Sequence, residues 1–130
     1  MPTFETFEKK RKPPSTEAVI SLLRTGVISF NGFAYNLLDR PEQVELVYAR
    51  EERLVGIRPV TAETSFSYPV RELTSAAGGT FNVSAKAFFQ YYGLTEDRSI
   101  RRIARLIDGI LCVDLNDEGQ DITAERGARS

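Results

Sequence analysis

The stretch GVISFNGFAYNLL, residues 26–38, changes from the alternating pattern of a β-strand to the pattern of a short helix within a few residues. Asn31 stands where the pattern changes, and an asparagine side chain can accept a hydrogen bond from the first turn of a helix. Pro41 limits how far that helix continues, because the residue before a proline disfavours helical geometry. The stretch therefore predicts a strand, a cap at Asn31 and a short helix over FAYNLL.

Hairpins are expected on both sides of this stretch. Upstream, AVISLL and VISF are two apolar, β-branched runs separated by the glycine-containing turn Arg24-Thr25-Gly26, which is typical of a β-hairpin. Downstream, VELVYA and LVGIRPV have alternating character and are separated by a polar turn. The first half of the chain therefore predicts a hairpin, a helix and a second hairpin.

The second half repeats this order. YPVREL and TFNV, separated by the loop TSAAGG, predict a hairpin, and Ser84 is then expected to cap a helix over KAFFQYY that Gly93 ends. RRIARLI and ILCVDL flank Asp108-Gly109, a strong two-residue hairpin turn because both positions tolerate positive φ. Because Ser84 follows Asn31 by 53 residues and the elements recur in order, we interpret the chain as an internal duplication. The alternative is two unrelated halves that are both rich in hairpins.

The residues GVISFNGFAYNLL followed by VELVYAREERLVGIRP resemble the AbrB-like swapped-hairpin family. A tandem copy in one chain is similar to the MraZ arrangement. The resemblance covers roughly residues 16–60 and, less closely, 67–115. It implies a mainly β fold with two short helices (α+β), built as an internally duplicated swapped-hairpin β-barrel with pseudo-twofold symmetry. It also implies a DNA-binding transcription regulator or an antitoxin, since family members are typically one or the other.

Length and composition indicate one folded unit. The chain has 130 residues, of which 42% are hydrophobic and 27% charged. We expect a single globular unit over residues 16–116, made of repeats 16–60 and 67–116, with mobile polar tails at 1–15 and 117–130. No apolar run approaches the roughly 18 residues of a membrane span, and charges stand where a signal peptide would be apolar. We therefore expect a cytoplasmic protein with no membrane partner.

The chain has no histidine and one cysteine, Cys112. Without imidazole there is no Ser-His or Cys-His nucleophile and no His-ligated metal, and a lone cysteine excludes a multi-cysteine zinc site. We therefore expect no enzyme, no cofactor and no metal site. The apolar setting ILCVDL predicts that Cys112 is a buried, unreactive thiol.

Basic side chains form the candidate site for nucleic acid. Arginine forks suit phosphate oxygens, and a mobile basic arm can follow a phosphate backbone without reading sequence. The candidate residues are Lys9, Lys10, Arg11, Lys12, Arg24, Arg98, Arg101, Arg102 and Arg105. Arg24 with Arg50, Arg53 and Arg58 would be the counterpart in the first half. The simpler interpretation is a set of solvated charges, partly neutralised by Glu96, Asp97 and Asp108. Residues 16–113 contain equal numbers of acidic and basic side chains, so the core is not basic.

These observations predict a DNA-binding regulator or accessory factor, with DNA as the partner. One alternative is a protein-interaction or assembly module, including antitoxin-like binding or self-association, which the near-neutral core favours. The missing arginines also favour it: the AbrB-like family tends to have an arginine after the turn glycine, and this chain has Val27 and Thr80 at those positions. Another alternative is a single-strand binder that stacks bases on Phe88, Phe89, Tyr91 and Tyr92. The helical spacing of those aromatic residues predicts that most of them belong to the core.

Overall fold

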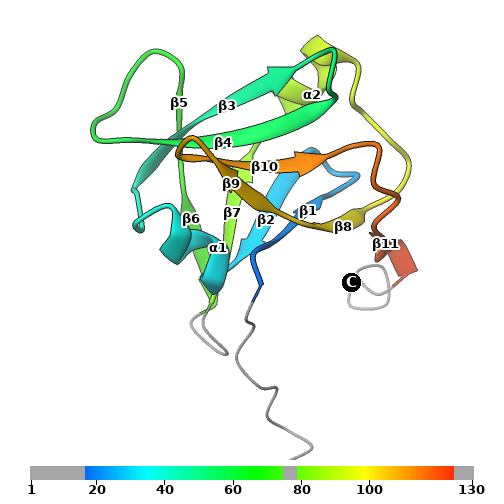
Figure 1. Ribbon diagram of the computed structural model, residues 1–130, viewed down its shortest axis with the longest axis horizontal. Helices are drawn as coiled ribbons and strands as arrows, with labels where there is room; N and C mark the ends of the chain where they lie inside the picture. Colours follow the sequence, from blue (N-terminus) through cyan, green and yellow to red (C-terminus); the bar gives the residue numbers. More distant parts are fainter. Residues whose placement is uncertain (1–16, 75–78, 125–130) are drawn as a thin grey trace, which may run out of the picture.

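The computed structural model describes residues 17–74 and 79–124, and the described chain is mainly β. Its strands form two antiparallel sheets, and two short helices accompany them. Sheet A has the strand order β11-β8-β1-β2-β7-β6, and sheet B has the order β5-β3-β4-β10-β9. In Figure 1 the strands β3, β4 and β10 run across β1, β2 and β7, with the helices at opposite ends of the molecule. The expectation of a mainly β fold with two short helices is confirmed.

The elements have the following bounds. Sheet A contains β1 (Val19–Leu22), β2 (Val27–Asn31), β6 (Arg71–Thr74), β7 (Thr80–Ser84), β8 (Ile100–Ile103) and β11 (Gln120–Asp121). Sheet B contains β3 (Gln43–Ala49), β4 (Leu54–Val60), β5 (Ser67–Pro69), β9 (Arg105–Ile107) and β10 (Ile110–Asp114). The helices are α1 (Gly32–Leu37) and α2 (Lys86–Tyr92). Neither described helix has the length of a membrane-spanning segment.

The predicted hairpins are present. β1 pairs with β2 across the turn at Gly26, and β3 pairs with β4. β9 and β10 meet at Asp108-Gly109, where both residues have positive φ, 51° and 79°, as a tight hairpin turn requires. β6 pairs with β7, although most of the connecting loop TSAAGG, residues 75–78, lies outside the described residues.

The two helices begin differently. Asn31 caps α1 as predicted, because its Oδ1 accepts from the backbone N of Ala34 at 3.0 Å. The predicted cap at Ser84 is wrong: Ser84 is the last residue of β7, and Ala85 takes the cap position without a side-chain hydrogen bond. The strand extends to Ser84 because this residue still pairs with Val27 of β2. α2 ends as predicted at Gly93, which is left-handed with φ 67°.

Two segments that were each predicted as one strand are divided between the sheets. YPVREL breaks at Val70, so that β5 lies in sheet B and β6 in sheet A. RRIARLI breaks at Ala104, so that β8 lies in sheet A and β9 in sheet B. The break residues keep backbone hydrogen bonds, from Val70 N to Glu42 O at 3.0 Å and from Ala104 N to Ala18 O at 2.8 Å. The chain can therefore pass from one sheet into the other without leaving the amides of the break residues unpaired.

The folded unit also extends beyond the expected boundary at residue 116. Strand β11 pairs with β8, and Ile122 is almost completely buried. The backbone N of Ser99 donates to Oγ1 of Thr123 at 2.8 Å. Residues 117–124 thus belong to the fold rather than to the expected tail. The expected amino-terminal tail, residues 1–15, and residues 125–130 lie outside the described residues.

The core lies between the two sheets. Alternate residues of paired strands point into it, as the strand period of two requires. They include Ile28, Phe30, Phe81 and Val83 from sheet A and Val55, Ile57, Leu111 and Val113 from sheet B. The ring of Phe81 stacks on that of Tyr35 from α1, with ring centroids 4.1 Å apart. Helix α2 contributes Phe88 and Phe89, whereas Tyr91 is exposed, so that most of the aromatic set in this helix belongs to the core as predicted.

Candidate functional site

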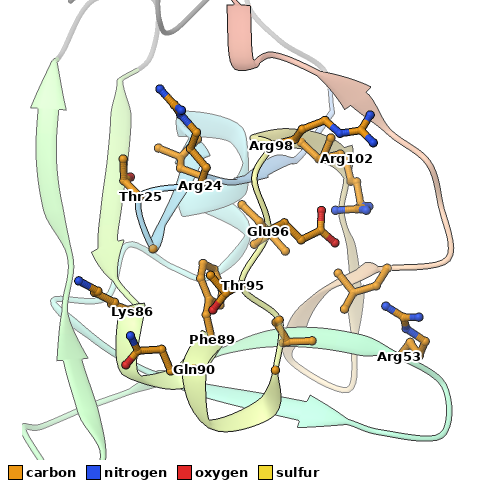
Figure 2. A pocket seen from close by; sticks show the side chains of 17 residues that line it. Arg24, Thr25, Arg53, Lys86, Phe89, Gln90, Thr95, Glu96, Arg98 and Arg102 are labelled. Atoms are coloured by element: carbon orange, nitrogen blue, oxygen red, sulfur yellow. The ribbon is translucent and has the colours of Figure 1, made fainter.

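A pocket of about 100 Å³ lies where the β1–β2 turn, helix α2 and the segment leading into β8 meet. The basic side chains that line it come from four separate parts of the chain. They are Arg24, Arg53, Lys86, Arg98 and Arg102, and Glu96 is the one acidic residue among the lining residues. Figure 2 shows Glu96 near the middle of the view, with Arg24, Arg98, Lys86 and Arg53 around it. This arrangement gives the pocket an excess of positive charge.

The β1–β2 turn and the start of α2 are in direct contact. The backbone N of Ala85 donates to the carbonyl oxygen of Gly26 at 2.8 Å. Gly26 has φ 88°, and a Cβ placed on it would lie 2.9 Å from Cβ of Lys86. Only a glycine allows this approach. Any other residue would be strained at this positive φ, and its Cβ would clash with Lys86 at the start of α2. The contact brings Arg24 and Lys86 to the same pocket.

Ser99 joins the same turn to the segment before β8. It is buried, and its Oγ accepts from the backbone N of Arg24 at 3.0 Å. Its carbonyl oxygen accepts from the backbone N of Ile122 at 2.9 Å, which ties this junction to the carboxyl-terminal segment. Arg98 precedes Ser99 and therefore lies next to Arg24. The Arg98 side chain is 70% exposed and lies 3.7 Å from a carboxylate oxygen of Asp121, an exposed ion pair of little strength.

Arg102 occupies the recessed part of the pocket and is only 8% exposed. Its Nε donates to the main-chain oxygen of Asp117 at 2.6 Å. Burial lowers the pKa of Arg102, and the negative charges of Glu96 and Asp117 act in the opposite direction. An arginine stays charged in proteins, so Arg102 carries a buried positive charge. The carboxylates of Glu96 and Asp117 stabilise that charge.

The structure brings together three of the predicted arginines and separates two others. Arg24, Arg98 and Arg102 line the pocket. Arg101 is not among the lining residues, because neighbouring side chains of a strand point to opposite faces; its Nη1 lies 3.5 Å from Oε1 of Gln120. Arg105 lies in sheet B, where β9 places it opposite Cys112 of β10. The predicted basic arm, Lys9, Lys10, Arg11 and Lys12, lies outside the described residues.

The arginines of the first half have three different settings. Arg53 lines the pocket. Arg50 lies over the ring of Tyr92, with its guanidinium carbon 4.9 Å from the centroid, and Arg58 pairs with Glu45 at 2.7 Å. Lys86 was not among the residues predicted from the sequence, because only the contact between Gly26 and α2 places this lysine beside the arginines.

Cys112 is not among the residues that line the pocket. Cys112 is partly buried; burial raises the pKa of its thiol, and the positive charge of Arg105 acts in the opposite direction. The prediction of a buried thiol is therefore met only in part, and the direction of the pKa shift is the one that low reactivity requires. Within residues 17–74 and 79–124, no group of three or more His, Cys, Asp or Glu side chains is placed to hold a metal ion.

Comparisons with known proteins add no family to this description. Neither the protein-family models, nor the curated proteins, nor the solved structures include a match to this chain.

Proposed function

We propose that this protein is a DNA-binding regulator or accessory factor that docks on the phosphate backbone through the basic side chains around the pocket. The observation that carries the proposal is the convergence of five cationic residues on one pocket that contains a single carboxylate. Phosphate neutralisation supplies most of the affinity in binding of this kind, and a concentrated positive surface is its footprint.

The geometry of the pocket favours contacts to the phosphate backbone of DNA over readout of base edges. Arg24, Lys86 and Arg98 are exposed and lie on a turn, a helix start and a loop. The described helices have six and seven residues, and neither presents a row of polar side chains that would suit a DNA groove. Exposed arginine and lysine side chains on short connections instead suit phosphate oxygens, which position a protein without specifying a sequence.

Salt-titrated fluorescence anisotropy with a labelled duplex tests this proposal. We expect binding near 50 mM salt that weakens steeply by about 200 mM, because the affinity comes from counterion release. The double variant Arg24→Gln/Arg98→Gln should bind more weakly and should have a shallower salt dependence. Arg105→Gln is the matched control, since it removes the same kind of charge outside the pocket. A wild-type protein that does not bind DNA even at the lower salt concentration would refute the proposal.

We also propose that the fold is an internally duplicated swapped-hairpin barrel related to the AbrB-like family. In support, the bounds of β7 follow those of β2 by 53 residues, and these two strands pair in sheet A between β1 and β6. In sheet B, β4 and β10 pair in the same way between β3 and β9. The segments that break at Val70 and Ala104 each belong to both sheets. A duplicated chain that completes its own core predicts a light-scattering mass near 14.6 kDa.

A second candidate function is self-association or binding of a protein partner. It is favoured by exposed apolar side chains on the consecutive strands β8 and β9, namely Ile103, Leu106 and Ile107, which are 56%, 46% and 39% exposed. Exposed large apolar side chains of this kind are candidates for contact with a partner. A light-scattering mass of twice the monomer that returns to the monomer in Leu106→Lys would favour this function over DNA binding alone.

A further inference from the structure

The guanidinium of Arg102 differs from the other basic groups of the pocket because it is recessed. Arg102 is 8% exposed, whereas the side chain of Arg98 is 70% exposed. The hydrogen bond from Nε to Asp117 O holds the group in one orientation. In Figure 2 the side chain of Arg102 lies between Arg98 and Glu96. A ligand that reaches this guanidinium must therefore enter the pocket.

The terminal nitrogens of Arg102 have no acceptor among the described residues. The ion pairs of the described residues are Arg58 with Glu45 and Arg98 with Asp121, and neither includes Arg102. In the same residues, the one buried polar side-chain atom without a partner is Oδ1 of Asn82, so the free nitrogens of Arg102 are not sealed inside the protein. They are donors with access to solvent, and Arg102 is one of the residues that line the pocket. An anion that enters the pocket can accept charge-assisted hydrogen bonds from these nitrogens.

The shape of the pocket decides which anion fits. Its volume of about 100 Å³ accommodates several atoms, because one water needs about 10–15 Å³. The internal phosphates of a duplex are flanked by sugars and lie on a convex surface, so they meet the exposed rim at Arg24 and Arg98 but not a recessed group. A terminal phosphate projects on one ester bond and can enter. It also carries a charge of about −1.5 to −2 at neutral pH, against about −1 for a phosphodiester.

We propose that the Arg102 pocket binds a terminal phosphate group, a phosphomonoester, with the two terminal nitrogens of Arg102 donating to its oxygens and Arg98 closing over it from the rim. The phosphate would belong to the 5′ end of a nucleic acid or to a small phosphorylated molecule. Binding of a nucleic-acid 5′ end rests on the proposed DNA binding, whereas binding of a small phosphorylated molecule does not. Glu96 opposes binding, because its carboxylate lies in the same pocket.

The experiment compares two oligonucleotides of one sequence, one with a 5′-phosphate and one with a 5′-hydroxyl, each labelled at the 3′ end. We expect the wild-type protein to bind the 5′-phosphate form about tenfold more tightly, the size of a charge-assisted hydrogen bond or two. Arg102→Gln should abolish this preference, whereas Arg105→Gln should keep it. Glu96→Gln should increase the preference because it removes the opposing charge. Equal affinity of the wild-type protein for both ends would overturn the inference while leaving the proposed DNA binding intact.

Two further arms cover the other outcomes. If circular dichroism shows that Arg102→Gln does not fold, the test uses Arg98→Gln and Glu96→Gln, which change exposed residues. If the preference for the 5′-phosphate oligonucleotide is unchanged in both variants, the inference is overturned. If the protein binds neither oligonucleotide, calorimetric titration with a nucleoside 5′-monophosphate decides. Binding that is weakened by Arg98→Gln then supports the phosphomonoester pocket on a small molecule, and absence of binding overturns it.

Discussion

The Nε of Arg102 donates a hydrogen bond to the main-chain oxygen of Asp117 at 2.6 Å. This bond joins β8 to a segment that the sequence analysis assigned to a polar tail. It orients a buried guanidinium whose other nitrogens remain available to the pocket. The carboxyl-terminal segment is therefore part of the candidate site as well as part of the fold.

Gly119 controls how closely that segment approaches β8. It has φ 63°, and a Cβ placed on it would lie 2.5 Å from the carbonyl oxygen of Arg101 and 2.8 Å from Cγ of Arg102. We predict that Gly119→Ala lowers the free energy of unfolding by more than about 1 kcal/mol, because steric conflict with the backbone adds to the cost of the left-handed conformation. Urea unfolding measures the change. Gly93→Ala is the matched control, since Gly93 has φ 67° and open space around it; equal losses would contradict the close contact.

Asn31 and Ser84 provide a paired test of the two helix starts. Oδ1 of Asn31 accepts from Ala34 N at 3.0 Å and from Val19 N at 3.2 Å, so the side chain caps α1 and holds the start of β1. Asn31→Ala should cost about 1–2 kcal/mol of unfolding free energy. Ser84→Ala should change it by less than about 0.5 kcal/mol, because Ser84 is exposed and does not cap α2. A comparable loss at both positions, measured by urea unfolding, would show that Ser84 caps its helix after all.

The pair between Glu45 and Arg58 should stabilise the fold at neutral pH and not in acid. The hydrogen bonds from Arg58, and a weaker one from Thr64, hold the pKa of the Glu45 carboxyl below 4.5, against a smaller opposing effect of burial. A lowered pKa means that the folded state binds fewer protons, so the stabilisation is present above pH 4.5 and is lost as the pH falls through the folded pKa. The difference in unfolding free energy between wild type and Glu45→Gln should therefore shrink on acidification. A difference that stays constant from neutral to acid pH would count against the pair.

Cys112 should react slowly with Ellman's reagent in the folded protein. Burial raises the pKa of its thiol, so less thiolate is present at a given pH than in the unfolded chain. We expect the rate to increase when urea unfolds the protein. Arg105→Gln should slow the reaction of the folded protein further, because Arg105 lowers this pKa. Equal rates in folded and unfolded protein would indicate that the thiol is not protected.

Local chemistry explains which parts of the fold could be predicted. The turns at Gly26 and Asp108-Gly109 and the helix end at Gly93 depend on positive φ, which glycine and aspartate tolerate and which sequence reveals directly. The cap at Asn31 depends on a side chain three residues from its partner. Ser84 offered the same local signal and was misassigned, because a long-range pair with Val27 keeps it in a strand.

The candidate site was predictable only in part. The cluster of Arg98, Arg101, Arg102 and Arg105 is visible in the sequence, but its members divide between two faces and two sheets. Alternation along β8 turns Arg102 into the pocket and Arg101 away from it, and the break at Ala104 carries Arg105 to sheet B. Lys86 and Arg53 reach the pocket from distant parts of the chain.

The sequence by itself determined the local elements: where the chain turns, which runs alternate, and where the two short helices begin and end, apart from the start of the second. These depend on the conformational preferences of a few neighbouring residues. The tertiary structure alone decided that the chain passes from one sheet into the other at Val70 and Ala104, that residues 117–124 close over β8, and that five basic side chains share one pocket. The reason is that these features depend on pairing and burial between residues far apart in the chain, whose energy appears only when the whole core assembles.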